Sequence, residues 1–266
     1  MTKTIAQPEQ PQHQWLPLDK LKVHPDVQRR FNQKWADTIA AKFDPEAFGE
    51  LYVSSDGNGA YFIWDGQHRA AAARKALGPE QMVYCRVHGP EAVGILAARS
   101  LKLNSSKRWH PIDTFEQRVK ANEWKARAVH GTLHQFGLRV DHTRDDGVVQ
   151  AVSACDWIIE TQGGQATFER TIRILFKAWE KDSDAYHHSL LWGVAMLVAR
   201  YGSLLDDTEL ADKLAKSGGP ARMIGRIRDY SKSAFQTVKR ASVEVLRGLY
   251  NKGKSRKGLP PWEEQA

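Results

Sequence analysis

Cysteine is scarce in this sequence, and long apolar runs are missing. The 266 residues include two cysteines, Cys85 and Cys155, which lie far apart and lack the spacing of metal ligands. This usage excludes a disulfide-rich scaffold and is typical of a reducing compartment. No apolar run reaches the length of a membrane span, and the N-terminus has no signal-peptide pattern. We therefore expect a cytoplasmic protein that has no membrane as a partner.

Acidic residues are outnumbered by basic ones. The chain has 39 lysines and arginines against 31 aspartates and glutamates, a formal net charge of +8 and a pI of about 9.4. This balance favours nucleic acid or another polyanion as a partner, although a basic balance is also common in soluble proteins without such a partner. The hydrophobic fraction of 41% is ordinary, and the length suits one large domain or two smaller ones.

One stretch predicts a strand, a sharp turn and a helix in direct succession. Residues 61–64 are aromatic or β-branched, Asp65-Gly66 ends that run, and the alanines at 70–73 favour a helix. Gly66 allows the backbone to turn sharply. The residues from Gly66 to Arg69 therefore lie at a helix N-terminus, where free N–H groups and the helix dipole attract an anion. The stretch predicts an anion site, with phosphate as the first ligand to consider.

The side chains of this turn allow a functional and a structural interpretation. Arg69 has a forked cation that suits phosphate, and His68 titrates near neutral pH, so that it could contact phosphate or transfer a proton. His68 and Asp65 are the candidate catalytic residues. Alternatively, Asp65-Gly66 forms only a turn with a cap, Arg69 is solvated, and His68 supports its neighbours.

The rest of the chain reads as a small α/β domain followed by helices. Trp35, Ile39 and Phe43 recur every four residues, which predicts an amphipathic helix over 32–43. A long helix is expected over 115–136, and the apolar segment 189–201 is expected in the core. We expect the tryptophan-bearing helices to form core rather than a cofactor site. The predicted organisation is a flexible N-terminus at 1–14, an α/β (α+β) domain with a small mixed sheet at 15–114, an all-α domain at 115–250 and a basic tail at 251–266.

Basic side chains accumulate towards the C-terminus. Such a field of charge binds the phosphate backbone of nucleic acid through counterion release. Residues 209–216, a Ser-Gly-Gly turn and a second helix over 220–230 have the spacing of a helix-turn-helix, although two packed helices joined by glycines would look the same. The predicted DNA-binding residues are Arg222, Arg226, Arg228, Lys239, Arg240, Lys254, Arg256 and Lys257.

Three motifs follow one another in the first 115 residues. They are Gln28-Arg29-Arg30, Gly66-Gln67-His68-Arg69 and Asn104-Ser105-Ser106-Lys107-Arg108. Their order and spacing resemble the ParB/sulfiredoxin superfamily, in which ParB has a Gln-Pro-Arg box, a Gly-Glu-Arg-Arg box that opens a helix, and a Glu-Asn-x-x-Arg box. The segment from Asp65 to Arg69 also resembles the DGQHR signature of DNA-phosphorothioation regulators and of many phage and mobile-element proteins. The C-terminal half resembles, more loosely, the helical half of phage ParB-like proteins.

The resemblance implies a ParB/sulfiredoxin-like fold with a site for a nucleoside triphosphate, CTP or ATP, together with Mg²⁺. Gly66, Gln67, His68 and Arg69 would cradle the phosphates, and Asn104 would position the phosphates or a metal. The further phosphate contacts that it implies are Gln28, Arg29, Arg30, Lys107 and Arg108. The metal ligands are unassigned, because Leu103 occupies the position of the ParB acid; Asp65, Asp113 and Glu116 are the possible substitutes.

These observations predict a ParB-like protein of phage or mobile-element type that binds a nucleotide and DNA, in the cytoplasm of a bacterium or phage-infected host. Hydrolysis of the triphosphate would control its engagement with DNA, and a homodimer is compatible with this interpretation. The alternatives are a metal-dependent ParB-like nuclease, a non-catalytic DNA-binding regulator with a decayed nucleotide site, and a small-molecule kinase. Sulfiredoxin chemistry is excluded, because Gln67 stands where those enzymes have their reactive cysteine.

Overall fold

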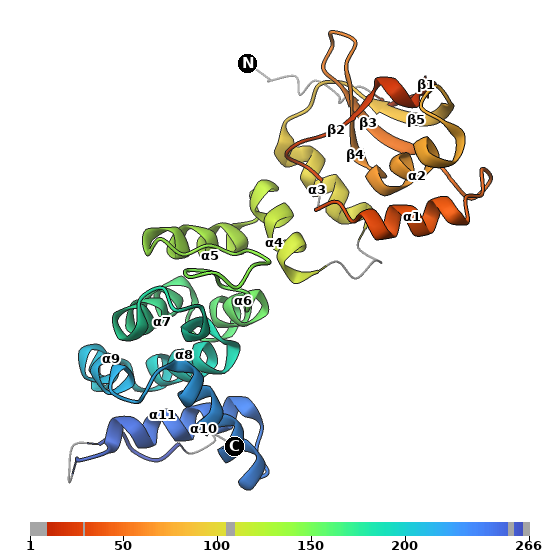
Figure 1. Cartoon of the computed structure of the whole chain (residues 1–266). Coiled ribbons are helices and arrows are strands. Elements are labelled where there is room, and N and C mark those ends of the chain that lie inside the picture. Colours follow the sequence, from red (N-terminus) through yellow and green to blue (C-terminus); the bar gives the residue numbers. More distant parts are fainter. Residues whose placement is uncertain (1–9, 29, 105–109, 255–257, 263–266) are drawn as a thin grey trace, which may run out of the picture. The chain divides into compact units, whose positions relative to one another are not determined.

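A mixed five-stranded sheet forms the centre of the N-terminal part of the chain (Figure 1). The computed structural model describes residues 10–28, 30–104, 110–254 and 258–262. The strand order is β1-β5-β3-β4-β2, in which β1 and β5 are antiparallel, β5 and β3 parallel, β3 and β4 antiparallel, and β4 and β2 parallel. The expected α+β architecture with a small mixed sheet is therefore present.

The chain divides into two compact units, residues 1–122 and 123–266. The predicted domain boundary after Thr114 falls inside helix α4 of the first unit. The elements of the first unit are β1 (Gln12–Pro17), η1 (Leu18–Lys20), β2 (Leu21–Val23), α1 (Gln33–Ala41), β3 (Leu51–Ser55), β4 (Tyr61–Asp65), α2 (Gln67–Leu77), β5 (Met82–His88), α3 (Val93–Leu103) and α4 (Pro111–Lys120). Those of the second unit are α5 (Trp124–Gln135), α6 (Val152–Thr161), α7 (Gly164–Trp179), η2 (Ser183–Tyr186), α8 (His188–Tyr201), η3 (Gly202–Leu204), α9 (Asp207–Ala215), α10 (Pro220–Ser233) and α11 (Val238–Asn251).

Strand β4 contributes to two apolar clusters, because successive side chains of a strand point to opposite faces. Ile63 packs in a cluster with Ala70 and Ala73 of α2. Trp64 packs in a second cluster with Leu96 of α3. All five side chains are buried, and the alanines of α2 allow that helix to approach the sheet closely. Helices α2 and α3 thus anchor the end of β4, where the predicted turn begins.

Two expectations about helices were wrong. The long helix expected over 115–136 is two helices, since Asn122 adopts a left-handed φ of 58° and the Glu123 carboxylate accepts the Ala126 N–H at the start of α5. Such a residue interrupts a helix, and asparagine tolerates this conformation better than most. In α1, Trp35 is not core: it is 52% exposed, and Ala36 is the buried residue of the helix, whereas Phe43 of the same stripe packs partly buried against the core cluster.

Helix α8 forms the centre of the second unit, as its apolar sequence predicted. Leu190, Leu191, Val194 and Leu197 are fully buried. Helices α7 and α11 pack against α8, and α9 packs against α7. Within the described residues of this unit the regular structure is helical, apart from an isolated β-bridge between Arg139 and Val148.

Both cysteines are free and buried. Burial raises the pKa of the Cys85 thiol to about 12, and burial also raises the pKa of the Cys155 thiol. Thiols of this kind are inert at neutral pH. Among the described helices, we find none that is both long and apolar enough to cross a membrane.

The contact between α8 and α11 depends on a glycine. A Cβ at Gly193 would lie 2.6 Å from Leu246 Cδ1 and 2.8 Å from Ser242 Cβ. We predict that Gly193→Ala lowers the free energy of unfolding by about 1–3 kcal/mol, the usual cost of overpacking a core. The measurement is chemical unfolding followed by circular dichroism.

Gly248→Ala is the matched control for this substitution. Gly248 also lies in α11, but a Cβ added there would have no neighbouring atom within 4 Å, so alanine is expected to leave the stability unchanged or raise it by up to about 1 kcal/mol. Equal effects of the two substitutions would contradict the close packing of α8 on α11.

Candidate functional site

The turn between β4 and α2 has the predicted geometry. Gly66 has a φ of 100°, in the left-handed region, and α2 begins at Gln67. A Cβ at position 66 would lie 2.6 Å from Leu51 Cδ2 and 3.1 Å from Arg69 Nη2. Only glycine meets both requirements without strain, so the chain needs Gly66 to start this helix where it does.

The carboxylate of Asp65 joins three segments of the first unit. Its Oδ2 pairs with Arg69 Nη2 at 3.2 Å, and its Oδ1 accepts a hydrogen bond from Asn104 Nδ2 at 2.9 Å. Arg69 Nη1 also donates to the Phe48 carbonyl at 2.9 Å. The side chain of Asp65 is 19% exposed, and Asn104 is buried. The guanidinium of Arg69 therefore holds the turn and the segment before β3 together.

His68 and Gln28 connect the first motif to the central turn. His68 is buried, its Nε2 accepts the Asn32 N–H at 3.0 Å, and its ring stacks on Phe31 with 5.0 Å between ring centroids. Because Nε2 is an acceptor, the neutral ring has its proton on Nδ1. Gln28 Nε2 donates to the Ile63 carbonyl at 2.9 Å. These contacts fix the segment that enters α1.

Gln28 and His68 line a pocket of about 300 Å³, together with Asp65, Arg69 and Asn104. Its wall is formed by apolar side chains of α1 and of the segment that follows it, namely Trp35, Ile39, Phe43 and Phe48. Lys42 and Asp44 also line it. Its polar floor consists of Gln28, Asp65, Gly66, Gln67, His68, Arg69 and Asn104. A polar floor beside an apolar wall suits a ligand that has one polar and one apolar end.

The charges around the pocket are largely balanced. Arg69 is paired with Asp65, so these two charges cancel, whereas the Asp44 carboxylate accepts the uncharged N–H of Glu46 at 2.9 Å and keeps its negative charge. Lys42, in contrast, is exposed and has no ion pair within the described residues. An anionic ligand would therefore meet Lys42 as the cation that is not already paired.

Most of the residues predicted to bind phosphate line this one pocket, namely Gln28, Gly66, Gln67, His68, Arg69 and Asn104. Arg30 is exposed and does not line the pocket. Arg29, Lys107 and Arg108 lie outside the described residues. Sequence reasoning missed Lys42 and the apolar wall; the signal was the stripe of Trp35, Ile39 and Phe43, which is as typical of a pocket wall as of a core.

A metal-holding cluster is not formed by the described residues. No group of three or more His, Cys, Asp or Glu side chains among them is placed to bind one ion. Asp65 lies at the end of β4, whereas Asp113 and Glu116 lie on α4. Asp65, whose two oxygens are already bonded to Arg69 and Asn104, is the one carboxylate that this pocket could offer Mg²⁺ at the end of β4, and the Asn104 amide oxygen could be a second ligand.

The predicted DNA-binding residues of the second unit fall into two groups. Arg222, Arg226 and Arg228 are exposed on α10, and the described residues offer none of them an ion pair. The other described members are engaged, whereas Arg256 and Lys257 lie outside the described residues. Lys239 Nζ lies 3.9 Å from the centroid of the Trp157 ring, Arg240 Nη2 donates to the Trp262 carbonyl at 2.6 Å, and Lys254 Nζ pairs with Glu209 Oε2 at 2.6 Å.

The two helices with helix-turn-helix spacing have other main packing partners. Helix α9 packs against α7 and α11, and α10 packs mainly against α11. In a helix-turn-helix the two helices pack on each other. The arrangement therefore favours two core-packed helices joined by the turn at Gly218 and Gly219, both of which have a φ of 94°.

Comparison with known proteins places the chain in a family. Residues 24–262 match the family described as "Family of unknown function (DUF6551)", and the chain belongs to it. A search of the curated proteins gave no match.

Two solved structures of the C-terminally truncated chromosome-partitioning protein ParB from Caulobacter crescentus are similar to the chain. The one complexed with CTP-gamma-S has 16% identity and a TM-score of 0.29, and the similarity covers 76% of this chain and 98% of that one. The one complexed to the centromeric parS site has 14% identity and a TM-score of 0.36, with 87% and 98% covered. TM-scores below 0.5 leave function to be inferred from the geometry of this chain.

The bond between Asn104 and Asp65 gives a testable prediction. Asn104→Ala removes the donor from a largely buried carboxylate oxygen and is expected to lower the free energy of unfolding by about 1–3 kcal/mol. Gln33→Ala removes the same kind of amide–carboxylate bond, to Asp37 at 3.0 Å, at an exposed position, and should cost less than about 0.5 kcal/mol. Thermal unfolding of both variants measures the difference. Equal losses would show that Asn104 does not support the turn.

Proposed function

We propose that the first unit binds a nucleotide in the pocket at the start of α2, as a ParB-like nucleotide-binding domain would. The observation that carries the proposal is the convergence of Gln28, the turn from Asp65 to Arg69, and Asn104 on one pocket, although these residues are far apart in sequence. CTP or ATP with Mg²⁺ is the ligand that we propose.

The two sides of the pocket suit the two ends of a nucleotide. The apolar wall offers Trp35 and Phe43 as surfaces for the base, and aromatic faces of this kind stack on any base. The phosphates would lie at the N-terminal end of α2, near Lys42, where the helix dipole favours negative charge. Asp65 and Asn104 would share Mg²⁺ with the phosphates.

His68 has a positioning role in this proposal. Its Nε2 already accepts the Asn32 N–H, so it would have to give up that bond before it could act as a base. Hydrolysis of the triphosphate, a homodimer, a phage origin and a cytoplasmic location remain predictions.

A thermal-shift series tests the nucleotide proposal. ATP, CTP, GTP and UTP are added separately, each with Mg²⁺, and at least one is expected to raise the melting temperature. A ligand at 100 times its Kd stabilises the folded state by about 2.7 kcal/mol. No shift with any of the four would overturn the proposal.

Replacing a lysine with glutamate at two positions, one on α1 and one just after it, tests whether the nucleotide binds in this pocket. Lys42→Glu is expected to weaken binding about tenfold or more, because it places a carboxylate beside the phosphates. Lys34→Glu makes the same change of charge at an exposed position of α1 that does not line the pocket, and should bind like the wild type. Arg69→Ala is expected to abolish binding, since it also releases Asp65 and the Phe48 carbonyl.

A second candidate function is nucleic-acid binding by the second unit, through α10 and the turn that follows it. Met223 and Ile227 of α10 are buried, which leaves Arg222 and Arg226 on the exposed side of the helix. Phe235 follows α10, is 97% exposed and has a φ of 50°. An exposed aromatic ring after the C-terminal end of α10 and arginines in its first half, unpaired among the described residues, together offer the stacking and charge by which single-stranded nucleic acid is bound.

Electrophoretic mobility shifts across a salt series test this second function. Arg222→Ala combined with Arg226→Ala is expected to weaken binding and reduce the slope of log K against log salt by about 2. Arg127→Ala combined with Lys177→Ala removes the same charge from exposed positions on α5 and α7 and should leave the slope unchanged. Phe235→Ala should weaken binding to single strands without changing the slope. Equal slopes for both double variants would contradict a role for α10.

A further inference from the structure

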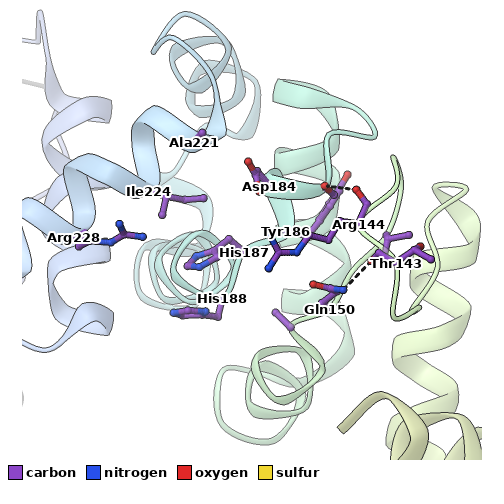
Figure 2. Close-up of a pocket in the computed structure, with 13 residues that line it drawn as sticks. Thr143, Arg144, Gln150, Asp184, Tyr186, His187, His188, Ala221, Ile224 and Arg228 are labelled. Carbon is purple, nitrogen blue, oxygen red and sulfur yellow. Dashed lines mark hydrogen bonds between the residues drawn. The ribbon is translucent and has the colours of Figure 1, made fainter. Parts of the chain in front are cut away.

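The second unit contains a pocket that the proposed function does not use. Its volume is about 560 Å³, and its lining comes from the loop 141–147, η2, the start of α8, and α10. Figure 2 shows Arg144 and Arg228 reaching towards His187 from opposite sides. Both arginines are exposed, and neither guanidinium has an ion pair within the described residues. Asp184 is an acidic side chain that also lines the pocket.

Two histidines lie between the arginines. The ring centroids of His187 and His188 are 3.9 Å apart, and the His188 ring also packs on Trp192. His187 caps α8, because its Nδ1 accepts the Ser189 N–H. With Nδ1 as the acceptor, the proton of the neutral ring lies on Nε2, where it can be donated.

The histidines are neutral at pH 7. The pKa of His187 is lowered to about 4, mainly by burial; His188 and Arg228 also lower it, and Asp184 acts in the opposite direction. Burial also lowers the pKa of His188. The positive charge of the pocket therefore comes from Arg144 and Arg228, and the histidines supply hydrogen-bonding groups.

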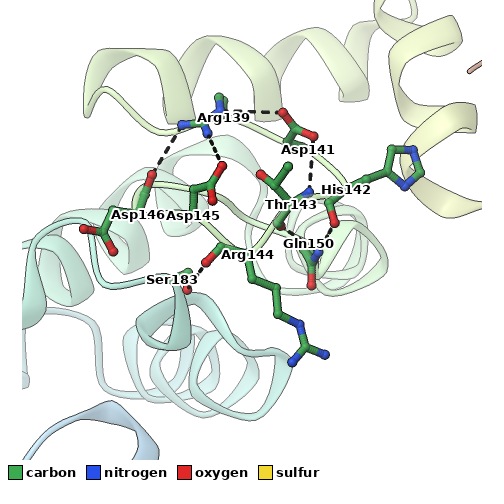
Figure 3. Close-up of polar contacts among 9 residues, drawn as sticks. All are labelled: Arg139, Asp141, His142, Thr143, Arg144, Asp145, Asp146, Gln150 and Ser183. Atoms are coloured by element: carbon green, nitrogen blue, oxygen red, sulfur yellow. Dashed lines mark hydrogen bonds and ion pairs between the residues drawn. The ribbon is translucent and has the colours of Figure 1, made fainter.

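The loop that presents Arg144 is held in place by polar contacts (Figure 3). Arg139 Nη2 pairs with Asp145 at 3.5 Å, and Arg139 Nε lies 3.7 Å from Asp141 Oδ2. Gln150 Nε2 donates to the carbonyls of residues 142 and 143, at 2.9 and 2.8 Å. These bonds fix the backbone on both sides of Arg144, so that its side chain is presented from a preformed loop.

We propose that this pocket binds a phosphate group of a small phosphorylated molecule or of a nucleic-acid backbone. Phosphate fits because a guanidinium can form two parallel hydrogen bonds with it, and two guanidinium groups reach the pocket from separate elements. The N-terminus of α8, a helix of 14 residues, adds its dipole in the same place. The proposal is independent of nucleotide binding by the first unit.

Calorimetry with pyrophosphate on the full chain tests this site. The wild type is expected to bind it, and Arg144→Ala and Arg228→Ala are each expected to weaken binding about tenfold or more. Arg127→Ala removes a comparable exposed arginine from α5 and should bind like the wild type. All three positions are exposed, so circular dichroism should show that the variants remain folded.

Two further arms separate the sites and the ligand sources. Lys42→Glu should keep this binding, which would distinguish the pocket from that of the first unit. A short DNA duplex that competes with pyrophosphate would identify backbone phosphate as the source, and a duplex that does not compete would identify a small molecule. The proposal is overturned if pyrophosphate does not bind at about 10 mM, or if the two pocket variants bind like the wild type.

Discussion

The pairing of the Asp65 carboxylate is the interaction on which the first unit's site depends. A carboxylate that is mostly removed from water must be paired or hydrogen-bonded, and Asp65 takes one partner from α2 and one from the end of α3. This requirement brings three distant segments to one place. It also changes the role of Arg69: a cation that the motif suggests for phosphate is already bonded to Asp65 and to the Phe48 carbonyl. The pocket is consequently built by charge pairing rather than by an excess of positive charge.

Local patterns predicted the parts of this site that depend on neighbours in sequence. The break at Asp65-Gly66 and the alanines after it were sufficient for the strand, the turn and the helix, because Gly66 satisfies a backbone requirement that no other residue meets as easily. The hydrogen bond from Asn104 to Asp65 joins residues that are 39 positions apart, so no local sequence pattern predicts it. Its prediction came from the family resemblance, which placed both residues in one site but not in contact.

The period of apolar residues predicted helix α1, but it did not show whether the apolar stripe of that helix packs on the core or lines a pocket. A repeat of four residues identifies one face of a helix, whether that face packs on a core or lines a pocket. Trp35 shows the difference, since it lies on the stripe and is 52% exposed. The same limit applies to counts of charge. Lys239, Arg240 and Lys254 look like a basic surface in the sequence, yet an aromatic ring, a backbone carbonyl and a carboxylate engage them in the fold.

The pocket of the second unit is lined by two arginines that have no ion pair within the described residues. The structure places Arg144 and Arg228 beside His187 and His188 in one concavity. Two guanidinium groups in one concavity repel each other unless an anion or water lies between them. Asp184 can balance one of these charges, so the lining retains a positive charge while both histidines are neutral. In the part of the chain that the structure describes, unpaired arginines also occur on the exposed side of α10, but Arg144 and Arg228 line one concavity, where a ligand that brings negative charge would relieve their repulsion.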